Sequence, residues 1–223
     1  MLNRFSPRRI MRKLRDDSNG ISMVEFALVL PVLLTLGLFG TEIARMAFTR
    51  MQVSQVALSV ADNASRLGQT DNSGITPTIN ETDVATILNG GLRQGLSIDM
   101  EQNSRIILTS LEFDDPSGRQ YIAWQRCIGD LDRDSRYGDD GDNNGLNGDQ
   151  LSGMGQGGTQ ITAQSNTAVM FVEIHYAYES FWDNPFGPGA GNFYEEAAFL
   201  IRDDRNLDPG LTGTEITDTQ CGS

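Results

Sequence analysis

One long, mostly apolar stretch, Ile21–Gly40, limits what this 223-residue chain can fold into. As a helix, a stretch of this length would reach about 30 Å, which is the thickness of the hydrocarbon core of a bilayer. Glu25 is the one charged residue within it. A charged side chain near the centre of a membrane helix costs about 2.5–3.5 kcal/mol, so a carboxylate here needs an explanation. The stretch therefore predicts a single membrane-spanning helix with a glutamate near its start.

The charges around this stretch predict its orientation. Residues 1–20 carry six arginines and lysines against two aspartates, whereas the whole chain has a net charge of −13. Basic residues on one flank of a membrane helix stay in the cytoplasm, so we expect a cytoplasmic N-terminus and an exported remainder. The acidic remainder also argues against nucleic acid as a partner, because binding to phosphates requires clustered Lys and Arg.

A cleaved secretory signal is the main alternative to a membrane span. Such a signal has an apolar core of about 7–15 residues, followed by an Ala-x-Ala-like cleavage site. Here the apolar core is longer, and the sequence FGTEIARMAF at its end offers no good site of small residues. These two differences favour a membrane span over a secretory signal.

Apolar residues continue at helical spacing beyond the span, from Ile43 to Leu67, and no Pro or Gly interrupts residues 41–67. The pattern stops at Gly68, before a turn-rich segment. We expect either one helix over residues 21–67 or a membrane helix followed by a separate amphipathic helix that packs on the exported domain.

The remainder, residues 68–223, reads as an exported domain with one more helix and several strands. The predicted elements are a helix at Glu81–Gln94 and strands at Arg105–Phe113, Gln120–Ile128, Asn166–Phe181 and Glu195–Arg202. In the third strand Glu173, His175 and Glu179 alternate with apolar residues, which predicts a half-buried strand with a solvated histidine. The fold class is therefore α+β, with the long helix laid across a small antiparallel sheet.

The chain shows no catalytic motif. Cys127 and Cys221 would both lie in the exported part, where a disulfide is the expected state of a cysteine pair. A nucleophilic Cys127 would need His175, the single histidine of the chain. There is no Gly-x-Ser-x-Gly, no His-rich metal cluster and no phosphate loop, so we predict that the protein is not an enzyme.

A Gly/Asp/Asn-rich insertion at residues 129–158 separates the second and third strands. Asp140, Asp142 and Asn144, followed by Gly145, repeat the first half of a calcium loop. Its twelfth position, which should supply a bidentate glutamate, is Leu151. We therefore favour a flexible acidic loop, with weak calcium binding as the alternative and no other cofactor.

The sequence NGISMVEFALVLPVLLTLGLFGTEIAR, residues 19–45, resembles the N-terminus of the TadE-like minor pseudopilins of the Tad (Flp) pilus system. The matching features are a basic leader that ends at Gly20, a glutamate at the fifth residue of the span, the run Val24–Pro31, and Glu42 after the span. Beyond this segment the resemblance is looser.

The resemblance implies that a prepilin peptidase cuts between Gly20 and Ile21. Glu25 would then pair with the free amino group of a neighbouring subunit and set subunit register. The implied location is the inner membrane, with a periplasmic or extracellular domain, and the implied partners are other pseudopilins and pilus assembly proteins. The exported domain is large for a major filament subunit, which favours a minor one. The alternative is a single-pass, membrane-anchored periplasmic binding module, with calcium or a protein as ligand and no pilus role.

Overall fold

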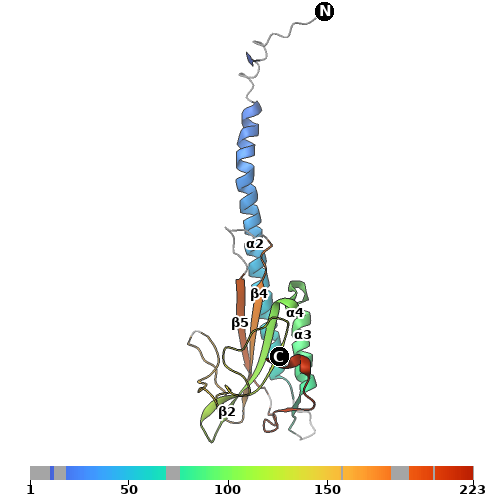
Figure 1. The fold of residues 1–223 in the computed structure, drawn as a ribbon, viewed down its shortest axis with the longest axis vertical. Coiled ribbons are helices and arrows are strands. Elements are labelled where there is room, and N and C mark those ends of the chain that lie inside the picture. Colours follow the sequence, from blue (N-terminus) through green and yellow to red (C-terminus); the bar gives the residue numbers. More distant parts are fainter. Residues whose placement is uncertain are drawn as a thin grey trace, which may run out of the picture.

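The computed structural model describes residues 11–12, 19–68, 76–156, 158–181, 191–202 and 204–222. Helix α2 (Asn19–Ser65) contains 47 residues, about 70 Å at the usual rise per residue. Its N-terminal half extends beyond the rest of the fold, and its C-terminal half lies against a four-stranded sheet (Figure 1). Most of the basic leader lies outside the described residues.

α2 is one continuous helix, which decides between the two predicted arrangements. Pro31 lies inside it and does not end it. The alternative of a membrane helix followed by a separate amphipathic helix is therefore wrong. The absence of Pro and Gly after Gly40 explains the continuity, because nothing in that segment interrupts the backbone hydrogen bonds.

The sheet consists of four antiparallel strands in the order β3-β2-β4-β5. They are β2 (Ser104–Asp114), β3 (Arg119–Ile128), β4 (Ala168–Tyr178) and β5 (Gly191–Leu200). β5 begins earlier than predicted, at Gly191 rather than at Glu195. The tight turn between β2 and β3 includes Gly118 in a left-handed conformation. Two short strands, β1 (Ile79–Asn80) and β6 (Leu211–Thr212), form a separate parallel pair.

Helix α3 (Glu81–Gln94) has the predicted bounds. Asn80 caps its N-terminus, since the side-chain oxygen accepts a 2.9 Å hydrogen bond from the backbone N–H of Asp83. Gly91 allows close packing on α2, because a Cβ at this position would lie 2.7 Å from a methyl of Val60. The 3₁₀ helix η1 (Leu96–Ile98) and the short helix α4 (Met100–Asn103) then lead into β2.

The main core lies between one face of the sheet and the helices α2 and α3. α2 contributes Val53, Val56, Ala57, Val60, Ala61 and Ala64, all fully or almost fully buried. Their spacing places them on one stripe of the helix, as the sequence pattern predicted. The fold is therefore α+β, with a long N-terminal apolar helix followed by a small antiparallel sheet.

The other face of the sheet carries a second, smaller core, and this corrects a prediction. β4 is buried on both faces along most of its length rather than half-buried. Its second face packs against residues from the insertion and the segment after it, including Met154 and Ala163. The insertion is therefore packed on the sheet, and Glu173 is fully buried beneath it.

His175 also differs from its predicted solvated state. It is half-buried, and its ring lies 4.7 Å from that of Tyr194 between centroids. Its Nε2 is buried and has no hydrogen-bond partner in the described part of the chain.

Candidate membrane and assembly segment

The N-terminal half of α2 exposes an almost purely apolar surface. Its exposed large side chains are Ile21, Met23, Val24, Phe26, Leu28, Val29, Leu30, Val32, Leu33, Leu34, Leu36 and Leu38. The helix is long and apolar enough to cross a membrane by length and composition, and its most apolar window is not buried against the domain. Water would solvate such a surface poorly, so this segment is a candidate membrane anchor.

Two threonine hydroxyls in or next to this apolar segment are satisfied by the helix itself. The Thr35 hydroxyl donates a 2.7 Å hydrogen bond to the carbonyl of Pro31, and the Thr41 hydroxyl donates at 2.9 Å to the carbonyl of Gly37. Both bonds join residues one turn apart, so neither hydroxyl needs water or another chain.

Gly20, Ile21 and Glu25 all lie on α2 and are exposed. Ile21 and Glu25 are four positions apart, which places them on the same side of the helix, one turn from each other. The domain does not cover this part of α2, so the Glu25 carboxylate is accessible to the surroundings of the helix.

The domain contacts α2 at Glu42, just beyond the apolar segment. The Glu42 carboxylate accepts a 2.7 Å hydrogen bond from the hydroxyl of Tyr178, near the end of β4, and is 3.3 Å from the backbone N–H of Phe181. Burial, together with the negative charge of Glu42, raises the pKa of Tyr178 to about 12, so the phenol keeps its proton. Arg45, one turn along the helix, lies over the rings of Tyr178 and Phe181.

A comparison with known protein families finds a match in this same segment. Over residues 20–62 the chain matches the model of the TadE-like protein family. No curated protein and no solved structure matches the chain significantly.

The match confirms the predicted resemblance and indicates a role associated with the Tad pilus. We call residues 20–62 the TadE-like segment. It includes Gly20, Ile21 and Glu25, and it also includes Glu42, whose contact with the domain the sequence did not predict. The sequence signal was a glutamate directly after the predicted span, because a carboxylate that becomes buried there needs a donor from elsewhere in the fold.

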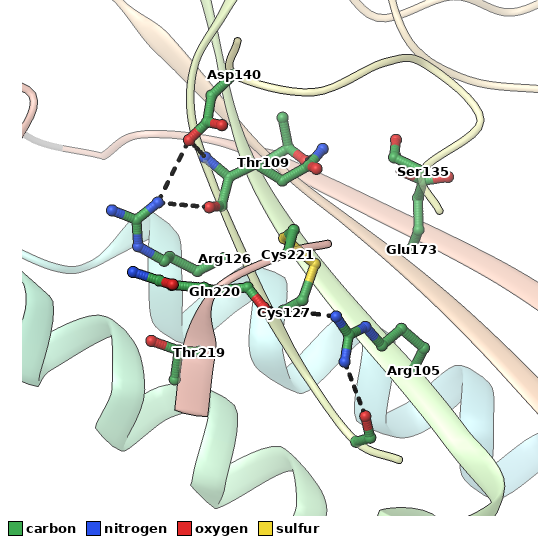
Figure 2. Close-up of a disulfide and its surroundings, with 12 residues drawn as sticks. Arg105, Thr109, Arg126, Cys127, Ser135, Asp140, Glu173, Thr219, Gln220 and Cys221 are labelled. Atoms are coloured by element: carbon green, nitrogen blue, oxygen red, sulfur yellow. Dashed lines mark hydrogen bonds and ion pairs between the residues drawn. A yellow bond between two sulfur atoms is a disulfide. The ribbon is translucent and has the colours of Figure 1, made fainter. Parts of the chain in front are cut away.

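Outside the TadE-like segment, a disulfide joins Cys127 at the end of β3 to Cys221 near the C-terminus. Figure 2 shows the bond, with Arg105 beside it donating to the carbonyl oxygens of Gly129 and Gln220. The 3₁₀ helix η2 (Thr217–Thr219) packs on β3 just before the disulfide. The C-terminal tail is thereby attached to the sheet both covalently and by hydrogen bonds.

Arg126, next to Cys127 on β3, connects several parts of the domain. Its guanidinium makes two hydrogen bonds to the carboxylate of Glu81 at the start of α3, at 2.6 and 2.9 Å. It also lies 3.3 Å from Asp140 of the insertion and 3.5 Å from Glu215 of the tail. The pair Arg126–Glu81 is almost fully buried, so removing either partner would leave the other as an uncompensated buried charge.

Two of the three candidate calcium ligands are engaged with protein groups. Asp140 accepts a hydrogen bond from the backbone N–H of Gln125 and pairs with Arg126 (Figure 2). The Asn144 side chain is buried and accepts hydrogen bonds from the backbone N–H groups of residues 146 and 147. Asp142 is exposed. Within the described residues, no group of three or more His, Cys, Asp or Glu side chains could hold a metal ion.

The disulfide also argues against a role of Cys127 as a catalytic nucleophile. A bonded sulfur is not a thiolate, so Cys127 cannot attack a substrate in this state. The His175 ring lies tilted against that of Tyr194, and Cys127 is bonded to Cys221 instead.

Proposed function

We propose that this protein is a minor pseudopilin, a structural and assembly subunit of a Tad-type pilus. It is inserted in the inner membrane through residues 21–40, with its N-terminus in the cytoplasm and its α+β domain on the other side. A prepilin peptidase removes residues 1–20 by cutting between Gly20 and Ile21. The observation that carries the proposal is the TadE-like segment, with Glu25 exposed on the apolar half of α2.

The chemistry of the proposed cut explains the position of Glu25. Cleavage leaves a free ammonium at Ile21, one helical turn from the carboxylate. Each charge alone is costly in hydrocarbon, and each can compensate the opposite charge of an adjacent subunit. Pairing between neighbours would bring the two helices to one relative height, which is the register role that we assign to Glu25.

Exposed apolar side chains continue beyond the span and support assembly through α2. Ile43, Phe48, Met51 and Leu58 are each about half exposed, although they lie past the apolar segment. The opposite stripe of the helix packs on the sheet. This apolar stripe lies outside the proposed membrane span, and the described domain does not cover it. It is therefore a suitable surface for other pilus assembly components.

The mass of the mature protein tests the proposal most directly. We expect a chain that begins at Ile21 when the protein is extracted from the membrane of cells with an active prepilin peptidase. In cells without the peptidase, or with a bulky residue in place of Gly20, the longer precursor should accumulate in the membrane.

A mature protein that keeps residues 1–20 in peptidase-active cells would overturn the pseudopilin proposal. The alternative would then stand: a single-pass anchored binding module in which Glu25 pairs with another membrane helix. A matched control is a bulky residue at Gly37, which also lies in α2 with open space around its Cα and should leave cleavage unaffected.

A further inference from the structure

Two glutamates lie directly opposite each other on neighbouring strands beneath the insertion. Glu173 on β4 pairs in register with Glu196 on β5, so both side chains lie on the same face of the sheet. Glu173 is fully buried and Glu196 is partly buried. Two carboxylates in such positions repel each other strongly if both are ionised, unless something between them compensates the charge.

The hydroxyl of Tyr194 stands between the two carboxylates. Its oxygen lies 2.7 Å from Oε1 of Glu173 and 2.5 Å from Oε1 of Glu196, and both are hydrogen-bond distances. A phenol has one proton and can donate to one of these oxygens only. Burial and the neighbouring carboxylates raise the pKa of Tyr194, so this proton stays on the phenol. The second short contact therefore requires another proton.

Other donors around the cluster do not supply that proton. The hydroxyl of Tyr137 donates to Glu196 at 2.6 Å, and the hydroxyl of Ser135 donates to Oε2 of Glu173. The backbone N–H groups of Arg136 and Gln156 donate to Glu173 and Glu196 respectively. All of these bonds go to the carboxylates and leave the contacts of Tyr194 unchanged.

We propose that Glu173 and Glu196 share one proton through the Tyr194 hydroxyl, and that this proton fastens the segment 135–156 to the sheet in a pH-dependent way. In the protonated state, Glu173 donates to the Tyr194 oxygen while Tyr194 donates to Glu196, and Glu196 carries the single negative charge. Burial raises the pKa of Glu173, in accord with a neutral acid at this position. The inference is independent of the proposed pilus role.

The charged groups that face the cluster come from the insertion and from β4. The Arg136 guanidinium lies 3.5 Å from the centroid of the Tyr194 ring, so it places one positive charge beside the cluster. His175, on the same face of β4, lies with its ring tilted against Tyr194, and burial and the charges of Arg136 and Arg133 lower its pKa. A neutral His175 adds no positive charge to compensate a second carboxylate.

Loss of the shared proton should weaken the hold on the insertion, because two ionised carboxylates would then repel each other at a largely buried site. The bonds from Ser135, Arg136 and Tyr137 end on these two carboxylates, so movement of the carboxylates away from each other would disturb those bonds. Tyr137 also packs edge-on against Phe171 in the second core. A carboxyl whose pKa is raised by folding contributes stability that is complete below the ordinary glutamate value of 4.5 and that declines as the pH rises towards the raised value. The insertion should therefore open more often as the pH increases through this window.

Hydrogen exchange of the full chain in detergent measures this opening. After correction for intrinsic exchange, opening at Arg136, Gly155 and Gln156 should rise by up to about tenfold per pH unit within the window. Glu173→Gln should abolish the slope, because an amide keeps the donor at all pH values. Glu195→Gln is the matched control, since Glu195 is adjacent on β5 and pairs with Arg50, and it should behave as the unmodified protein. A flat wild-type profile, or an equal slope in Glu173→Gln, would overturn the proposal.

Infrared spectroscopy distinguishes sharing from simple burial of Glu173. At neutral pH the wild-type protein should show a neutral-carboxyl band that decreases in Glu173→Gln and is unchanged in Glu195→Gln. Glu196→Gln should also remove that intensity, because Tyr194 can then donate to an ionised Glu173. If the band persists in Glu196→Gln, Glu173 holds its proton through burial alone and the sharing is disproved.

Discussion

The carboxylate of Glu42 and the hydroxyl of Tyr178 form a 2.7 Å hydrogen bond between residues that are 136 positions apart in the chain. Glu42 belongs to the TadE-like segment, whereas Tyr178 lies at the end of β4 in the domain. The bond therefore joins the segment that matches the family to the part of the chain that does not. It lies close to the place where the exposed, apolar half of α2 begins.

Tyr178→Phe should lower the free energy of unfolding of the domain by about 1–3 kcal/mol, because the buried Glu42 carboxylate loses one of its side-chain donors. The phenylalanine ring retains the packing under Arg45. Tyr176→Phe is the control, since this tyrosine on the same strand donates to a neutral carbonyl, that of Ile98, and its loss should cost less. Thermal unfolding in detergent measures both. Equal losses would show that the charge of Glu42 is not important.

Replacement of both cysteines by serine should destabilise the domain by about 2–4 kcal/mol, because the disulfide closes a long loop in the unfolded chain. The sequence separation of the two cysteines is 94 residues. The tail should also become the first site of proteolysis, since only noncovalent contacts, such as that between Arg105 and Gln220, would hold it among the described residues. Limited proteolysis with mass spectrometry checks this, and a tail that stays protected would contradict it.

Asp140→Ala and Asp142→Ala should have unequal effects. Asp140→Ala removes an acceptor of the Gln125 N–H and a partner of Arg126, so we expect a loss of about 1–2 kcal/mol. Asp142 is exposed, and its replacement should cost less than about 0.5 kcal/mol. Millimolar calcium should leave the melting temperature of the wild-type protein unchanged. A calcium-dependent rise that is lost in Asp142→Ala would instead establish the calcium loop.

His175 should make the domain less stable in mild acid. Burial and the charges of Arg136 and Arg133 lower its pKa in the folded state, so the unfolded chain binds a proton first as the pH falls. Stability from this group is complete above the ordinary histidine value of 6.5 and is lost as the pH falls towards the lowered value. His175→Gln should reduce this loss, which denaturant unfolding at several pH values would detect. An unchanged pH profile in the variant would refute the assignment.

Glu25→Gln should give a processed, membrane-held protein in cells with few or no pili. The amide makes the span less polar, so insertion should proceed, and cleavage should continue because Gly20 is unchanged. Assembly should fail because the Ile21 ammonium of the neighbour loses its partner, at a cost of several kcal/mol. Pilus counts with a blot for processing decide the matter, and Glu179→Gln, an exposed carboxylate outside α2, is the control. Normal piliation in Glu25→Gln would discard the register role.

The sequence by itself determined the elements that depend on local pattern. The span, the continuation of the helix to the neighbourhood of Leu67, the bounds of α3 and the presence of four main strands all follow from periodicity and from the positions of Gly and Pro. These signals are short-range, since the pattern of a helix face or of an alternating strand is visible within a short window of consecutive residues. The apolar run around Glu25 was evident for the same reason.

Only the tertiary structure decided which polar groups are buried and what they bind. Glu173 has the same alternation in sequence as a solvated strand glutamate, and it is buried because the insertion covers the second face of the sheet. Glu42 binds Tyr178, and Arg126 binds Glu81, although each pair is far apart in the sequence. A local sequence pattern does not predict such contacts. Burial of a charged side chain depends on a distant segment that supplies its partner, and that segment is chosen by the packing of the whole domain.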